Sequence, residues 1–212
     1  MKQFAASALL LVASAACCCA QQWEFGGMGG GGFLSNVNVS SPFGSASTGF
    51  KTGAAVGGFA GQNLYTHLSG ELRYTFLENN LHIRSNGQEA TFSGQAHVLH
   101  YDLLYHTNRK GSRRQFFVAA GAGMKVFRGT GKEQAYQPLY QFGYMTKTQQ
   151  VKPMASVGAG VRFTLSDRLF LRAEFRDYIT AFPTQLIAPA PGAKFGSILQ
   201  DFVPMVGLSY EF

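Results

Sequence analysis

A histidine and a serine two residues apart, His67 and Ser69, could form a nucleophile and its base. A histidine beside a serine can take the proton of the hydroxyl, and a carboxylate, Glu71, follows two residues later. Successive side chains of a strand point to opposite faces, so these three would share one face of an extended segment. The competing interpretation is a polar serine and histidine inside a larger buried polar set.

Ten charged residues form such a set, because they lie at alternate positions of predicted strands. The acids are Glu24, Glu71, Asp102, Glu174 and Glu211, and the bases are Arg73, Lys125, Arg162, Arg172 and Arg176. Buried charges are tolerated only when they are paired and hydrogen-bonded. Five acids and five bases on one face therefore predict a network of buried ion pairs. A gated pore, in which the pairs exchange partners, remains the alternative.

Other common chemistries lack their residues in this sequence. His97 and His100 are three positions apart, which places them on opposite faces of a strand and argues against joint metal binding. All three cysteines lie at positions 17–19, inside the N-terminal segment, so the rest of the chain has no thiolate to bind a metal. Gly131-Lys132 is followed by Glu133, so it does not complete a phosphate-binding loop. We predict no metal, no cofactor and no catalytic residue.

The elements that would position these charges are eight predicted strands. Their ranges are 23–33, 49–61, 66–78, 93–107, 114–128, 153–166, 168–179 and 202–212. Apolar and polar residues alternate within them, as with Leu72 and Tyr74 against Glu71 and Arg73. The glycines of the first strand, at positions 26, 27 and 29–32, lower its β propensity and indicate close backbone approach or strong bending. Beyond the N-terminus, no stretch approaches the ~20 apolar residues that a membrane-spanning helix requires.

One strand face is consistently apolar and the other mixes glycine with charge, which favours a barrel with lipid outside and a polar interior. A secreted soluble β-sandwich is the alternative, because alternation alone does not say which face is wet. The connections between predicted strands alternate long and short, beginning with a long one. Outer-membrane barrels have short periplasmic turns and long external loops, so both termini are expected in the periplasm.

The N-terminal residues predict export. Lys2 precedes an apolar stretch from Phe4 to Ala16, and small residues end at Ala20, so residues 1–20 form a predicted signal peptide and residues 21–212 the barrel domain. Cleavage before Gln21 would remove every cysteine. Lipidation at Cys17 is the alternative, although the usual leucine three residues earlier is absent.

The chain end resembles the C-terminal assembly signal of bacterial outer-membrane proteins, with Leu208, Tyr210 and Phe212 at alternate positions. Together with the signal peptide and eight strands, the chain resembles the small outer-membrane barrels that include the OmpA-like and OmpX-like proteins. The resemblance implies an all-β, eight-stranded antiparallel up-and-down transmembrane barrel. It also implies periplasmic chaperones, insertion by the barrel-assembly machinery, and contact with outer-membrane lipids including lipopolysaccharide.

The predicted function is a non-catalytic, monomeric role in envelope integrity or surface interaction, with a lumen plugged by ion pairs. A small porin-like pore for small or hydrophobic solutes, or an adhesin acting through loops 129–152 and 180–201, are the alternatives. The net charge of +7 does not indicate nucleic-acid binding, because the bases follow no single stripe. His67-Leu68-Ser69 resembles the His-x-Ser pattern of outer-membrane lipid A deacylases, but we expect these residues inside the barrel at its periplasmic end.

Overall fold

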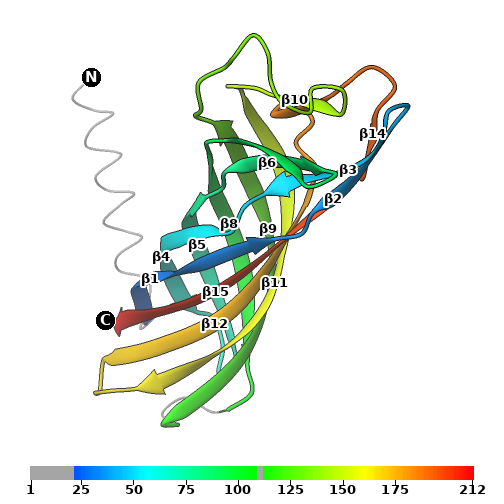
Figure 1. Cartoon of the computed structure of the whole chain (residues 1–212). Coiled ribbons are helices and arrows are strands. Elements are labelled where there is room, and N and C mark those ends of the chain that lie inside the picture. The colour runs from blue at the N-terminus through cyan, green and yellow to red at the C-terminus, as the bar shows by residue number, and fades with distance from the viewer. Residues whose placement is uncertain (1–21, 109–111) are drawn as a thin grey trace, which may run out of the picture.

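A computed structural model describes residues 22–108 and 112–212, and its regular elements are all β-strands (Figure 1). Among these residues no helix has the length and apolar character needed to span a membrane. The predicted signal peptide, residues 1–20, and the lipidation alternative at Cys17 lie outside the described residues. Both stay predictions.

Eight long antiparallel strands close into a barrel in the order β1-β15-β12-β11-β9-β8-β5-β4. They are β1 (Trp23–Leu34), β4 (Gly53–Asn63), β5 (Leu68–Glu78), β8 (Gly94–His106), β9 (Arg114–Gly129), β11 (Gln149–Thr164), β12 (Leu169–Ala181) and β15 (Ile198–Glu211). Each barrel strand pairs with the next along the chain, and β1 pairs with β15 to close the barrel. The predicted eight-stranded up-and-down barrel is confirmed, glycine-rich first strand included.

Three predicted strand boundaries were wrong at the ends of the barrel. The predicted strand 49–61 covers the end of one strand and most of another, because Phe50 closes β3 (Gly44–Phe50) and β4 begins at Gly53. Strands β11 and β15 begin four residues earlier than predicted, at Gln149 and Ile198. Polar residues interrupt the apolar alternation there, while the backbone ladder continues with the same register.

The long connections lie at one end of the barrel, and the short turns lie at the other with both described chain ends (Figure 1). Short turns mark the periplasmic end of such barrels, so the long connections are extracellular. These connections are structured, which the sequence reasoning missed. They form the extracellular sheet, ordered β14 (Lys194–Phe195), β2 (Val37–Ser41), β3, β6 (Leu81–Ser85) and β7 (Gln88–Phe92), and a ladder of β10 (Gly143–Met145) with β13 (Ile187–Pro189).

The turn between β6 and β7 shows why this sheet escaped prediction. Asn86 and Gly87 both adopt positive φ, 47° and 79°, as the tight hairpin turns favoured by Asn-Gly require. That dipeptide signal is present in the sequence, but its flanking strands have only five residues each. Segments so short carry too few alternations to be distinguished from a loop.

The outer face of the barrel wall has the apolar character that the sequence predicts. Outward side chains are apolar or aromatic, and Leu72, Leu99, Phe116 and Val118 are about half exposed in the isolated chain. This surface matches the apolar band that an outer-membrane barrel turns toward lipid. The apolar outer face is therefore confirmed.

The interior of the barrel matches the predicted polar character in only part of its length. Its extracellular half is apolar rather than charged, with Leu77, Val98, Phe127 and Leu199 fully buried. These side chains join Ile83 and other residues of the extracellular sheet in one hydrophobic core. The polar interior is restricted to the lower part of the barrel and to isolated pairs, because apolar residues occupy the inward positions near the extracellular strand ends.

Candidate functional site

Six charged residues form ion pairs between three strands at the centre of the lumen. They are Glu71 and Arg73 of β5, Asp102 of β8, and Arg172, Glu174 and Arg176 of β12. The two-residue spacing within β5 and β12 turns them all inward, as the strand geometry requires. Each is at least nine-tenths buried.

Two of the three carboxylates of this central cluster, Glu71 and Glu174, contact more than one cation. The Glu71 carboxylate lies 2.6 Å from Arg73 and 2.7 Å from Arg172. Glu174 accepts hydrogen bonds from Arg73 and, at 3.0 Å, from Arg172. Because every charge has several partners, the cluster satisfies the requirement that buried ions be both paired and hydrogen-bonded.

Asp102 extends the cluster to β8. Arg176 donates to it at 2.5 Å, and the His100 ring nitrogen Nδ1 lies 3.0 Å from its other oxygen. His100 was not among the predicted residues, although it shares the inward parity of Asp102. Two inward phenylalanines, also unpredicted, cover the cluster: the Arg172 guanidinium lies 4.4 Å from the Phe59 ring centre and 4.5 Å from that of Phe117.

A second group lies nearer the periplasmic end. Arg162 of β11 donates to Glu24 at 2.5 Å and to Glu211 at 3.1 Å, which ties the first barrel strand and the last to β11. The Phe170 ring lies 3.8 Å from this guanidinium. Arg162 also lines a hollow of about 740 Å³ at the barrel end, together with Asp167 of the last turn.

The cavities next to Arg162 inside the barrel are much smaller than this hollow. Two small cavities around His106 have volumes of about 10 Å³ each. That is close to the least space that holds a single water molecule. The hollow at the periplasmic end therefore stops at the Arg162 group.

The remaining predicted base, Lys125 of β9, is separate from both groups. It pairs with Asp201 of β15, and both side chains are fully buried. The Lys125 ammonium also lies 4.6 Å from the Phe127 ring centre. Asp201 was missed because the predicted last strand began one residue later, and with it the acids of the lumen outnumber the five predicted bases.

The residues considered for catalysis do not form the expected pair. The Ser69 hydroxyl lies 2.8 Å from Nε2 of His106, not from His67. His67 instead stacks on the outward-facing Tyr105 at 6.1 Å, so the prediction that it shares the inward face was wrong. It lies one residue before β5 begins, where strand alternation does not apply. Across the described ranges no group of three or more His, Cys, Asp and Glu could hold a metal ion.

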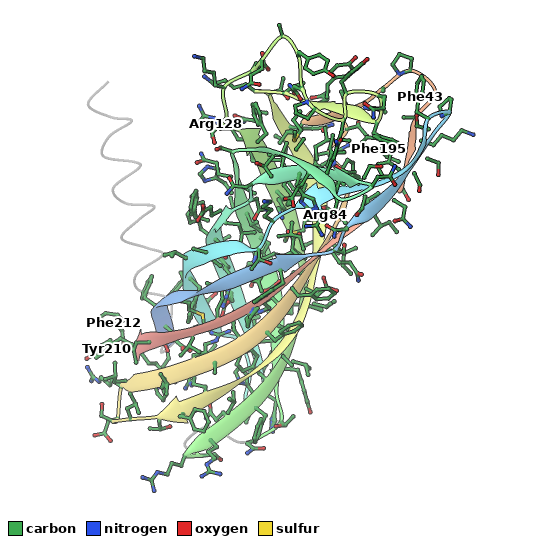
Figure 2. The ribbon with its side chains drawn as sticks, viewed as in Figure 1. Phe43, Arg84, Arg128, Phe195, Tyr210 and Phe212 are labelled. Atoms are coloured by element: carbon green, nitrogen blue, oxygen red, sulfur yellow. The ribbon has the colours of Figure 1, made fainter. Side chains whose placement is uncertain are left out.

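The predicted assembly residues lie on the outer wall at the periplasmic end. Figure 2 shows Tyr210 and Phe212 together at the end of β15, far from Phe43 at the loop end. Their rings meet edge to face at 4.8 Å, and Phe212 also contacts Phe25 at 5.8 Å. Leu208 is half exposed on the same face. Aromatic girdles of this kind mark the membrane interfaces of outer-membrane barrels.

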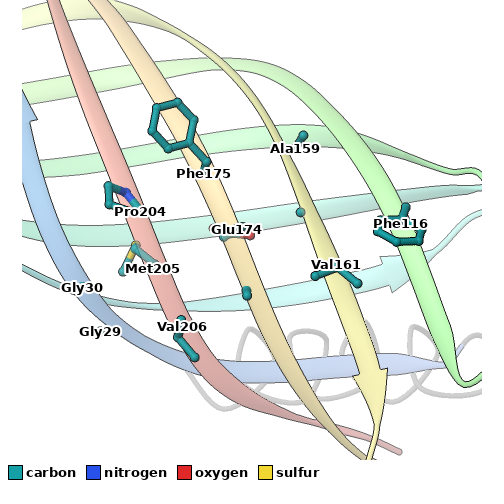
Figure 3. Close-up of a pocket in the computed structure, with 12 residues that line it drawn as sticks. Gly29, Gly30, Phe116, Ala159, Val161, Glu174, Phe175, Pro204, Met205 and Val206 are labelled. Carbon is teal, nitrogen blue, oxygen red and sulfur yellow. The ribbon is translucent and has the colours of Figure 1, made fainter.

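A hollow of about 590 Å³ indents the same outer wall (Figure 3). Phe116, Phe175 and Pro204 form its sides, and small residues such as Gly29 and Ala159 leave the space between them. This hollow belongs to the lipid-facing surface and is distinct from the lumen.

Together these observations define an integral outer-membrane β-barrel protein. The sequence matches the outer membrane protein beta-barrel domain family over residues 5–212, and the chain belongs to that family. No curated protein matches it.

Two solved structures show the same fold. Neisserial surface protein A is 12% identical, with 90% of this chain and 97% of that chain covered and a TM-score of 0.56. Outer membrane protein AlkL, determined in lipid bilayers, is 12% identical, with 90% of each chain covered and a TM-score of 0.51. At these identities the likeness concerns the fold alone.

Proposed function

We propose that this protein is a non-catalytic barrel that contributes to envelope integrity and does not conduct solutes. The observation that supports this proposal is the filling of the barrel interior, by buried ion pairs in its lower part and by an apolar core in its upper part. Interiors of eight-stranded barrels are just wide enough for side chains to fill them. A water path would need the ion pairs and the apolar core to open together.

Planar-bilayer recording of the purified protein tests the proposal. We expect no conductance steps from the unmodified protein or from Glu71→Gln, because the apolar core still closes the lumen above the altered pairs. Glu89→Gln, which changes an exposed carboxylate of the extracellular sheet, is the matched control. Conductance steps in the unmodified protein, or steps that appear only in Glu71→Gln, would establish the gated pore instead.

The partners expected from the resemblance remain part of the proposal. Leu208, Tyr210 and Phe212 would be recognised by the barrel-assembly machinery, with periplasmic chaperones holding the chain before insertion. Lipopolysaccharide would surround the monomeric barrel in the outer leaflet. The exposed position of all three side chains on one outer strand supports recognition by another protein.

Surface interaction is the second candidate function. Tyr136, Tyr140 and Tyr144 remain exposed at the extracellular end, whereas Phe142 and Ile187 of the same connections are buried. The connections are held by strand ladders, so their exposed residues keep fixed positions.

A further inference from the structure

Four aromatic side chains surround a hollow of about 590 Å³ at the extracellular tip. Phe43 comes from the turn between β2 and β3, and Tyr136, Tyr140 and Tyr144 come from the connection between β9 and β11. The exposed fractions run from 41% for Tyr144 to 73% for Phe43. We call this site the aromatic groove.

The tyrosines of the aromatic groove form a ladder of neighbouring rings. Tyr140 lies between the other two, with ring centres 5.3 Å from Tyr136 and 6.3 Å from Tyr144. In the described part of the chain, none of the three hydroxyls has a hydrogen-bond partner. The rings therefore present apolar faces and unused polar groups to the same space.

The backbone beneath the aromatic groove is held in place. The Gln137 amide bonds both the carbonyl and the N–H of Met145, at 2.7 and 2.9 Å, which closes the segment that carries the tyrosines. Leu139 has φ of 63°, a left-handed conformation rare outside glycine, and its side chain is buried. A strained, non-glycine residue persists only where its surroundings fix it.

The other walls are fastened to this segment. Ser41 donates a hydrogen bond to the Gln141 carbonyl at 3.2 Å, and Ala190 N–H donates to Phe142 at 3.3 Å. Gly192 has φ of 80°, and a Cβ there would lie 3.2 Å from Pro42, so a larger residue would disturb both the turn and the contact. A groove held in this way loses little conformational freedom when a ligand binds.

We propose that the aromatic groove binds an uncharged saccharide. A sugar ring has an apolar C–H face that can lie on an aromatic ring and a rim of hydroxyls that can bond tyrosine hydroxyls and the Gln141 amide. None of the residues lining the groove is charged, which gives an anionic or cationic ligand no partner. The volume falls within the ~300–1,000 Å³ of small-molecule sites.

This inference rests on the surface-interaction candidate and is independent of the closed lumen. The test applies fluorescently labelled protein in detergent micelles to an array of neutral, sialylated and sulfated oligosaccharides, followed by titration with the retained neutral sugar. We expect retention on neutral saccharides, at least about tenfold weaker binding by Tyr140→Ala, and about threefold weaker binding by Tyr140→Phe, which loses only the hydroxyl.

The matched control is Tyr65→Ala. Tyr65 is equally a tyrosine and is 75% exposed, but it lies in the periplasmic turn before β5. Its variant should bind like the unmodified protein, and heat-modifiable gel mobility confirms folding of every variant. Retention only on charged saccharides, no retention on the array, or equal binding by Tyr140→Ala and Tyr65→Ala would overturn the inference. None of these binding results bears on the conductance measurement, so the proposal of a non-conducting lumen is tested independently.

Discussion

At the residue scale, the Lys125–Asp201 pair shows how two isolated charges are kept in an apolar setting. Both side chains are fully buried, and the nearby Phe127 and Tyr178 belong to the hydrophobic core. Removal of one member leaves the other charge buried without compensation, which typically costs about 3–5 kcal/mol, while an apolar replacement of both is often neutral or stabilising.

Lys125→Met is therefore expected to lower the free energy of unfolding by about 3–5 kcal/mol. The measurement is urea unfolding in lipid vesicles, followed by the fluorescence of Trp23, the only tryptophan of the chain. The double variant Lys125→Met/Asp201→Leu should recover most of the loss. A single variant as stable as the unmodified protein would show that the pair is not a coupled unit.

His82 of β6 gives a pH dependence outside the membrane-spanning strands. Burial lowers the pKa of His82 below its ordinary value of 6.5, against the opposing influence of Glu89. The unfolded form therefore binds a proton more readily than the folded form, so stability is full above pH 6.5 and falls as the pH drops below it. The pKa of the Glu89 carboxyl is itself lowered by hydrogen bonds from Lys51 and Arg84, so this group stays ionised down to below pH 4.5.

Between pH 7 and pH 5 we thus expect faster amide hydrogen exchange in residues 81–92, caused by His82 alone. His82→Gln, compared with the unmodified protein at each pH, should remove this acceleration. An acceleration that persists in His82→Gln would assign the effect to another group.

At the element scale, the extracellular sheet is a structural extension of the barrel. Ile83 of β6 is 1% exposed and belongs to the same hydrophobic core as the barrel residues Leu77 and Phe127. A large-to-small change at such a position costs about 2–5 kcal/mol through lost burial and the cavity that remains. The loss of stability caused by such a change should be greatest in the extracellular sheet, which has fewer contacts than the barrel.

Ile83→Ala is accordingly expected to increase protease cleavage within residues 79–93 while the barrel keeps its heat-modifiable gel mobility. The exposed Arg84→Ala serves as the control on the neighbouring position. Equal cleavage of the two variants would contradict a shared core.

The last strand supplies the second prediction at this scale. Deletion of Phe212 removes its ring contacts with Tyr210 and Phe25 and one of the three proposed recognition residues. We expect several-fold less protein in the outer-membrane fraction, with the excess degraded in the periplasm. Phe33→Ala, a change to an outward aromatic at the opposite end of β1, should leave the amount unchanged.

The sequence predicted the eight strands because a regular period of two carries through each of them. It also placed Glu71, Arg73 and Asp102 on one face, but it could not say which acids meet which bases, since Arg176 reaches Asp102 across the lumen. That pairing depends on barrel closure. The extracellular sheet was not predicted because its strands are too short to show a regular alternation. Asp201 was not predicted because it lies at a strand end where polar residues interrupt the alternation.

At the scale of the whole molecule, the structure has two unlike ends. Trp23 and Phe212 lie at the periplasmic end, and a backbone hydrogen bond of 2.9 Å joins their main chains. Trp23 faces outward and is 43% exposed, so its indole should lie at the interface between headgroups and acyl chains. Lipids brominated near the headgroup should quench its fluorescence more than lipids brominated at the chain ends. The reverse order would place this end inside the bilayer core.

The extracellular sheet also implies an order of events during insertion. Its strands come from the connections after β1, β5 and β12, so β2 with β3 and β6 with β7 can pair within one connection. The pairings of β3 with β6 and of β14 with β2 join different connections and can form only after those connections have crossed the bilayer. Each connection must therefore cross while apolar residues such as Val39 and Ile83 still lack the core contacts that the other connections supply. Joining of the three connections into one sheet is therefore expected to be the last step of folding, after the barrel strands that carry them have inserted.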